Sequence, residues 1–195
     1  MGVPGCGKTT TFTSIAKSYN LPVFTEPEES LWPEAVKNYK DYPSGGYNLL
    51  QWFRSQRVPQ WYRADSLRGS TTVLVDTCYD LLLYYYMDRV SMSWLVDKSC
   101  PYYWLLKGIA YQDQRTLPKP DCIVFFYLDR KTWLRNLEQR GRVSDRCERM
   151  RENFETLQRN MYDAAIQYCK SYGVKLIDYH VGCEDLGLTL REAYI

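Results

Sequence analysis

The chain of 195 residues has very little histidine, since His180 is the single one. Histidine-based acid–base catalysis and histidine metal sites therefore have almost nothing to build on, and carboxylates must supply any general base. The seven cysteines are scattered without C-x-x-C spacing. This pattern argues for free thiols rather than a disulfide framework or a zinc site.

Long apolar runs and a strong charge of one sign are also missing. No run is long enough to span a bilayer, and no leader with a charged start and an apolar centre is visible. The formal net charge of +2 is too small to favour a nucleic-acid or membrane surface. We therefore expect a cytoplasmic protein without nucleic-acid or membrane partners, folded as one domain over residues 1–195.

The most informative motif is Gly-Val-Pro-Gly-Cys-Gly-Lys-Thr at residues 2–9, a complete G-x-x-x-x-G-K-T phosphate-binding loop. In such a loop the backbone N–H groups surround nucleotide phosphates, Lys8 reaches the outer phosphates, and Thr9 offers its hydroxyl to Mg²⁺. The alternative is a glycine-rich turn before a helix. We expect ATP to contact Gly2, Val3, Pro4, Gly5, Cys6, Gly7, Lys8, Thr9 and Thr10.

The apolar pattern predicts an α/β fold, because short strand-like runs alternate with longer segments of helical spacing. Strands are expected at residues 22–25, 71–76, 121–128 and 174–178, and helices at residues 9–19, 31–39, 47–56, 81–106, 130–142 and 148–172. A phosphate-binding loop normally follows a buried strand, yet only Met1 precedes it here. A parallel sheet flanked by helices is therefore expected, with its first strand missing or truncated.

Two carboxylates end predicted strands, at the edge where parallel sheets bind ligands. Glu26 follows residues 22–25, and Pro27 prevents the strand from continuing. Glu26 is either a general base or an ordinary charge at a helix start. Asp76 follows residues 71–75 and either assists Mg²⁺ through water or caps the strand end.

The order of these motifs resembles the deoxynucleoside kinases, a family that includes the viral thymidine kinases and is related to the thymidylate kinases. The resemblance implies a three-layer P-loop kinase fold. Thr25-Glu26-Pro27 with Trp32 downstream is similar to the family's Glu-Pro motif. The resemblance implies that Glu26 is the general base that accepts the proton of the nucleoside 5′-hydroxyl, and that Trp32 flanks the nucleobase.

Two further segments resemble this family. Tyr39-Lys40-Asp41-Tyr42-Pro43 is similar to its Tyr-Lys-Asp-Pro stretch, which implies that Tyr39 contacts the sugar 3′-hydroxyl. Gln51 is similar in position to a glutamine of the family that hydrogen-bonds the edge of the nucleobase. It is equally compatible with a solvated helix position.

Residues 140–149 resemble the arginine-rich lid of both kinase families. The resemblance implies that Arg140, Arg142 and Arg146 neutralise the transferring phosphoryl group and that Asp145 belongs to the substrate site. The alternative is a solvated basic helix. One departure concerns the residue after Asp76, where the family has an arginine and this chain has Thr77. Arg89 or a lid arginine is a candidate substitute.

These observations predict ATP- and Mg²⁺-dependent phosphorylation of a deoxynucleoside, with a pyrimidine such as thymidine favoured, at its 5′-hydroxyl. A thymidylate-type nucleoside monophosphate kinase is the alternative within this reaction class, and its additional phosphate would require Arg54, Arg57 or Arg63. A non-catalytic nucleotide-binding protein is the alternative from another class. The aromatic stretch at residues 81–106 suits either a homodimer face or a buried core.

Overall fold

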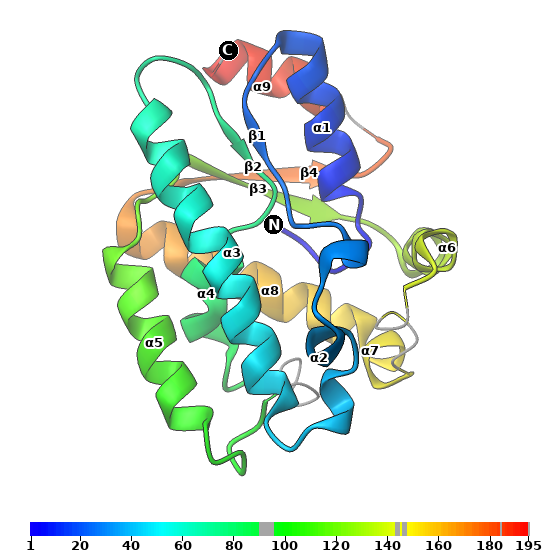
Figure 1. Cartoon of the computed structure of the whole chain (residues 1–195). Helices are drawn as coiled ribbons and strands as arrows, with labels where there is room; N and C mark the ends of the chain where they lie inside the picture. Colours follow the sequence, from blue (N-terminus) through cyan, green and yellow to red (C-terminus); the bar gives the residue numbers. More distant parts are fainter. Residues whose placement is uncertain (90–95, 143–144, 146–147, 184, 195) are drawn as a thin grey trace.

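The computed structural model describes residues 1–89, 96–142, 145, 148–183 and 185–194. The chain folds into parallel strands with helices on both sides (Figure 1), which confirms the predicted α/β class. The strands are β1 (Val23–Phe24), β2 (Leu74–Val75), β3 (Cys122–Tyr127) and β4 (Lys175–His180). Within the described ranges, β1 pairs with β2 and β3 pairs with β4, both in parallel, as two separate two-stranded sheets.

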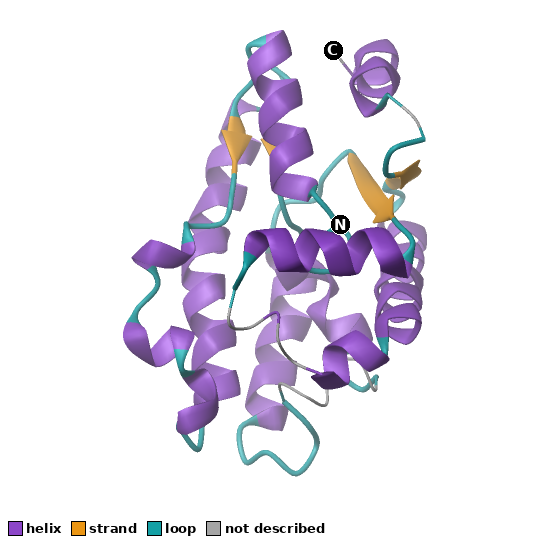
Figure 2. Cartoon of the chain, turned by 90° about the vertical axis from the view of Figure 1, so that its right-hand side faces the viewer, coloured by secondary structure: helices purple, strands orange, loops and turns teal. Residues whose placement is uncertain are grey.

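The helices account for most of the described structure, as Figure 2 shows. The α-helices are α1 (Lys8–Tyr19), α2 (Glu34–Lys37), α3 (Gly45–Leu67), α4 (Tyr79–Tyr86), α5 (Tyr103–Thr116), α6 (Arg130–Arg140), α7 (Glu148–Glu152), α8 (Phe154–Tyr172) and α9 (Leu186–Tyr194). Two short 3₁₀ helices, η1 (Glu29–Leu31) and η2 (Tyr39–Asp41), flank α2. In Figure 1, α1 and α9 lie on one side of the strands, and α4, α5 and α8 lie on the other.

The main core forms around β3, whose Cys-Ile-Val-Phe-Phe-Tyr sequence is apolar on both faces because helices cover both of them. Phe125 and Phe126 are fully buried there, together with Leu81 and Leu82 of α4. A smaller cluster of Trp32, Val36, Tyr39 and Leu49 joins α2 to α3. This second cluster fixes the segment that follows Glu26.

Four predicted helices differ from the structure. Residues 47–56 form only part of α3, and residues 148–172 are divided between α7 and α8. The aromatic stretch 81–106 is divided between α4 and α5, with Pro101 shortly before the start of α5. Residues 90–95 of this stretch lie outside the described residues. The segment 31–39 contains only the short helix α2, which begins directly after Pro33 because proline cannot donate a helical hydrogen bond.

The amino end of the chain lies inside the molecule, next to β3 (Figure 1). The Met1 amino group donates to the Val124 carbonyl, and the Phe126 N–H donates to the Met1 carbonyl at 2.8 Å. These two bonds follow the parallel ladder pattern, with Met1 opposite Phe125. The described chain therefore contains one residue, Met1, of the strand expected before the phosphate-binding loop. Its helices include none that is long and apolar enough to cross a membrane.

Candidate functional site

The phosphate-binding loop is held from outside by α6. The Trp133 indole donates to the Pro4 carbonyl at 2.7 Å, and the Asn136 amide donates to the Gly5 carbonyl at 3.1 Å. Gly5 has a φ of 79°, and a Cβ at this position would lie 2.5 Å from Leu137 Cδ2. The glycine is therefore required both by the left-handed backbone and by the close approach of α6.

Lys8 begins α1 and turns back over the loop. Its ammonium donates to the carbonyls of Gly2 and Val3, each at 3.1 Å. Burial alone would lower the pKa of Lys8, but the facing Cys6 sulfur and the Asp76 carboxylate outweigh it and raise the pKa above its usual value. The ammonium therefore carries a positive charge at neutral pH.

Thr9 and Asp76 form a pair at the end of β2. The Thr9 hydroxyl donates to Asp76 Oδ2 at 2.5 Å. The second oxygen, Oδ1, is buried without a hydrogen-bond partner in the described part of the chain. A hydroxyl beside an unpartnered carboxylate oxygen matches the oxygen ligands that Mg²⁺ prefers, so these two side chains fit that ion.

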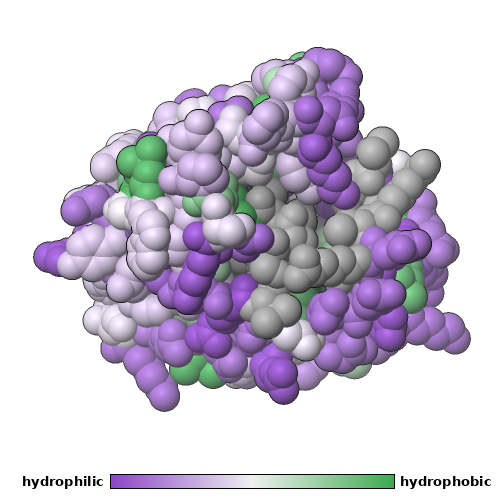
Figure 3. Space-filling view, turned by 90° about the horizontal axis from the view of Figure 1, so that it is seen from below, coloured by the Kyte–Doolittle hydropathy of each residue, from purple (hydrophilic) through white to green (hydrophobic). Residues whose placement is uncertain are grey.

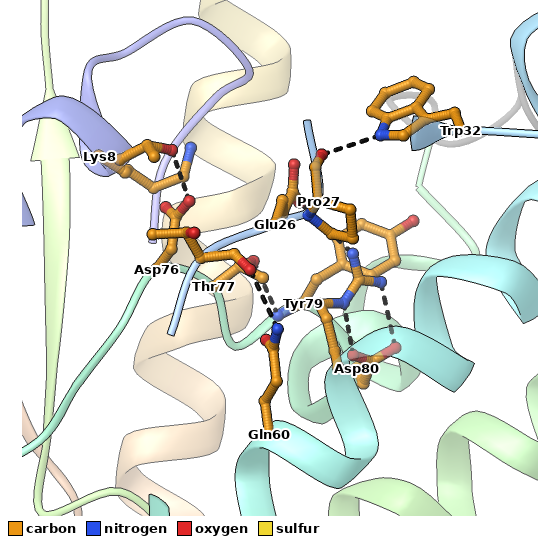
Figure 4. A network of polar contacts seen from close by, with 12 residues as sticks. Lys8, Glu26, Pro27, Trp32, Gln60, Asp76, Thr77, Tyr79 and Asp80 are labelled. Carbon is orange, nitrogen blue, oxygen red and sulfur yellow. Dashed lines mark hydrogen bonds and ion pairs between the residues drawn. The ribbon is translucent and has the colours of Figure 1, made fainter. Parts of the chain in front are cut away.

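Glu26 lies across the cavity from this pair, beside a buried ion pair (Figure 4). Its Oε1 is 3.5 Å from Arg57 Nη1, while Arg57 Nε donates to Asp80 Oδ2 at 2.7 Å. Burial alone would lower the pKa of Arg57, but Asp80 and then Glu26 raise it well above its usual value. Arg57 from α3 is therefore a fixed cation that links Glu26 to α4.

The aromatic side of the cavity follows Pro27. The Trp32 indole donates to the Pro27 carbonyl at 2.9 Å (Figure 4), and its ring packs edge-on against Phe53 at 4.9 Å between centroids. Trp32 and Tyr39 are buried, and both line the cavity. Gln51 is not among the lining residues, and its amide nitrogen is buried without a hydrogen-bond partner in the described chain.

The arginine-rich segment reaches the same cavity from α6. Arg140 is paired through two bonds with the buried Asp145, with Nε to Oδ2 at 2.7 Å. Arg142 Nε lies 3.2 Å from Glu29 Oε2, and Arg142 Cζ lies 5.2 Å from the centroid of the Trp32 ring. Arg146 lies outside the described residues.

Most of these groups surround one cavity of about 860 Å³. The predicted site residues that line it are Gly2, Pro4, Gly5, Gly7, Lys8, Thr9, Thr10, Glu26, Trp32, Tyr39, Asp76, Arg140, Arg142 and Asp145. Val3 and Cys6, which also belong to the loop, are fully buried and do not line the cavity. The strand-end carboxylates and the loop, far apart in sequence, thus meet in one place.

The positive charge beside Glu26 comes from α3, and not from the residue after Asp76 or from Arg89. Thr77 accepts a hydrogen bond from the Tyr79 N–H at 3.3 Å, and Arg89 donates to the Tyr85 carbonyl, outside the cavity lining. Arg57 supplies the positive charge instead. The sequence indicated Arg57 only as a candidate contact for an additional phosphate, because its partner Asp80 is 23 residues away along the chain.

No protein-family model and no curated protein sequence matches the chain. Solved structures of a deoxyadenosine kinase from M. mycoides are similar to it in fold. The structure with the products dCMP and a flexible dCDP has a TM-score of 0.71 at 20% identity, covering 98% of this chain and 95% of that one. The structure with bound dATP has a TM-score of 0.70 at 20% identity and covers 98% of this chain and 96% of that one. The structure with bound dCTP has a TM-score of 0.67 at 19% identity and covers 98% of this chain and 95% of that one.

Proposed function

We propose that this protein is an ATP-dependent deoxynucleoside kinase, which transfers the γ-phosphoryl group to the 5′-hydroxyl of a deoxynucleoside. The observation that carries the proposal is the shared cavity of Lys8, the Thr9–Asp76 pair and Glu26. The fold over almost the whole chain is similar to that of a kinase whose solved structures hold dCMP, dATP and dCTP, which supports the same substrate class.

Glu26 acts as the general base in this proposal. Its carboxylate accepts the proton of the 5′-hydroxyl while that oxygen bonds to the γ-phosphorus, and the bond from the γ-phosphorus to the bridging oxygen breaks to release ADP. Arg57 orients the carboxylate through Oε1, and Asp80 holds Arg57 in place from the other side. The base is therefore positioned before substrate arrives, which reduces the cost of reaching the reactive geometry.

The donor phosphates lie over the loop, where the backbone N–H groups and the Lys8 ammonium bind them. Thr9 and Asp76 would hold Mg²⁺, and the ion would supply positive charge that offsets the charge of the donor phosphates. Arg140 and Arg142 approach from the lid, residues 140–149, and neutralise charge on the transferring group; Arg146 is proposed to join them.

The nucleoside occupies the aromatic side of the cavity, between Trp32 and Tyr39. Flat rings offer stacking surfaces for a base, and the Tyr39 hydroxyl is proposed to contact the sugar. Gln51, the residue predicted to read the base, does not line the cavity, and a pyrimidine such as thymidine remains the acceptor that we propose. We also propose that residues 1–195 form one domain and that the protein is cytoplasmic.

A nucleoside monophosphate acceptor would require a further cation. Of the three candidate arginines, Arg57 is the one that lines the cavity, and it is already committed to Asp80. Arg54 is paired instead with Asp113, at 2.6 and 2.7 Å. This arrangement favours the nucleoside over the monophosphate as acceptor.

The test is transfer of labelled γ-phosphate from ATP·Mg²⁺ to the four deoxynucleosides and to thymidine monophosphate. The variants Lys8→Ala and Glu26→Gln are compared with Glu155→Gln, which changes an exposed carboxylate on α8. Label in a nucleoside monophosphate that both cavity variants abolish, and the control retains, supports the proposal. Label in the diphosphate alone would establish a nucleotide kinase, and ATP binding without transfer would establish a non-catalytic protein.

We also propose that the protein forms a homodimer. On α5 and just before it, Tyr102, Trp104 and Leu105 are exposed, Trp104 by 69%, and such apolar side chains suit a contact between copies. The face in Figure 3, seen from below, is mostly hydrophilic with separate small apolar patches. Sedimentation equilibrium of the wild type and of Trp104→Lys tests this, since a dimer through this face would dissociate in the variant.

A further inference from the structure

Arg142 and Glu29 form an ion pair between the two sides of the main cavity. Arg142 Nε lies 3.2 Å from Glu29 Oε2, and both side chains are partly buried. Arg142 follows the end of α6, on the side of the proposed donor phosphates, whereas Glu29 begins η1, on the side of the proposed nucleoside. Both residues line the cavity. The pair therefore joins two parts of the site that would bind different substrates.

The backbone position of Arg142 is tied to the phosphate-binding loop through α6. This helix donates to two loop carbonyls, from the Trp133 indole and from the Asn136 amide. It ends at Gly141, whose φ of 68° is left-handed and whose N–H donates to the Leu137 carbonyl at 3.0 Å. Arg142 therefore leaves α6 at a point that the loop itself fixes.

Glu29 is tied in the same way to the aromatic side of the cavity. The Trp32 N–H donates to the Glu29 carbonyl at 3.1 Å. The Trp32 ring belongs to the small core cluster that joins α2 to α3, and its indole donates to the Pro27 carbonyl. The backbone of Glu29 is therefore fixed relative to the ring that we propose to flank the nucleobase.

The Arg142 guanidinium also covers the Trp32 ring. Its Cζ lies 5.2 Å from the ring centroid, a cation–π distance, and Trp32 is only 8% exposed. The ion pair with Glu29 uses Nε. Because a guanidinium carries several N–H donors in a planar fork, one side chain can hold Glu29 through Nε and direct its Nη donors at a phosphoryl oxygen.

We propose that Glu29 is a positioning residue, whose ion pair with Arg142 holds the guanidinium against the nucleoside subsite so that the nucleoside leaves only when the pair opens. This inference rests on the proposed function. Since Arg142 serves both substrates, donor phosphates that bind it also stabilise its pair with Glu29. ATP and the nucleoside then strengthen each other's binding by the same factor, as linkage requires.

The test measures dissociation of each of the four deoxynucleosides by stopped-flow tryptophan fluorescence, with and without the β,γ-imido analogue of ATP and Mg²⁺. Glu29→Gln is expected to release the nucleoside about threefold to fivefold faster, the effect of losing one partly exposed ion pair. The analogue should slow release about fivefold in the wild type and have no such effect in Glu29→Gln. Glu34→Gln changes an exposed carboxylate of α2 that does not line the cavity and should behave as the wild type does.

Charge reversal separates positioning from a structural role of Glu29. Arg142→Glu alone should release the nucleoside quickly, because two carboxylates then face each other. Adding Glu29→Arg restores the ion pair with its charges exchanged and should restore slow release, although this double variant does not catalyse transfer. In steady-state kinetics, Glu29→Gln should raise the nucleoside KM about threefold to fivefold while kcat changes by less than about twofold.

The outcomes distinguish this inference from the proposed function. Equal release from the wild type and Glu29→Gln, or fast release from the charge-reversed double variant, would overturn the inference alone if the wild type phosphorylates one of the four deoxynucleosides. A wild type that binds ATP and phosphorylates none of them would overturn the proposed function, and this inference with it.

Discussion

Arg57, in the wall of the proposed catalytic cavity, forms an ion pair with Asp80, and both side chains are almost completely buried. The guanidinium donates through Nε at 2.7 Å and through Nη2 at 3.3 Å. A third contact, from Nη1 to Glu26 Oε1 at 3.5 Å, leaves the same guanidinium facing the proposed base. One arginine therefore connects the stability of the α3–α4 contact to the placement of Glu26.

Replacing Asp80 by Asn is expected to lower the free energy of unfolding by about 3–5 kcal/mol, because it leaves a buried guanidinium without its main counter-charge. Urea unfolding measures this. The double change Arg57→Met with Asp80→Leu should recover most of the loss, since no buried charge remains. Asp163→Asn removes an outer ion pair with Arg89 at 3.9 Å and should cost less than about 1 kcal/mol.

Replacing Asp76 by Asn is expected to raise the Mg²⁺ concentration for half-maximal phosphoryl transfer by at least about tenfold, because a neutral amide holds the ion less tightly than a carboxylate. A Mg²⁺ titration of the initial rate measures this. Asp41→Asn changes an exposed carboxylate and serves as the control. An unchanged Mg²⁺ requirement in Asp76→Asn would contradict the role assigned to Asp76.

Replacing Arg142 by Ala is expected to reduce kcat by about 10²-fold, the usual effect of losing one donor to a charged transition state. Steady-state kinetics with a deoxynucleoside acceptor measure it, with Arg159→Ala, at an exposed position of α8, as the control. Glu29→Gln should affect kcat much less, because it releases Arg142 from its 3.2 Å ion pair without removing the guanidinium. Equal losses in Arg142→Ala and Glu29→Gln would show that the pair matters only for structure.

Stability is expected to fall as the pH rises above 9. Burial raises the pKa of the Cys169 thiol from 9.0 to about 12. The unfolded chain therefore loses this proton first, and between these two values the folded state binds more protons, so a rise in pH favours unfolding. Urea midpoints at pH 8 and pH 10 should differ less for Cys169→Ala than for the wild type. Cys183→Ala, at an exposed thiol, should behave as the wild type does.

The sequence predicted the elements that local patterns determine. The helix predicted at residues 9–19 after the phosphate-loop motif is α1, Lys8–Tyr19, and β3 followed from its unbroken apolar run. Glu26 and Asp76 could be placed near the loop because both end parallel strands, where side chains converge. These predictions needed only short-range spacing and the general topology of parallel sheets.

The remaining features depended on packing between distant segments. Arg57 meets Glu26 and Asp80 only through the packing of α3 against α4, and no spacing along the chain specifies that contact. Gln51 was chosen from a resemblance, yet the helix phase of α3 directs Leu50 and Phe53 to the cavity instead. The division of the stretch 81–106 into two helices likewise required the fold.

Helix α6 binds the loop carbonyls of Pro4 and Gly5 near its middle and carries Arg140 at its end. A helix rises about 1.5 Å per residue, so the four steps from Asn136 to Arg140 span about 6 Å at that rise. The helix therefore fixes the distance between the phosphate-binding loop and Arg140. With the donor phosphates bound over the loop as proposed, this fixed distance would favour a donor whose terminal phosphate lies within reach of the Arg140 guanidinium, and a shorter or longer phosphate chain would be a poorer donor.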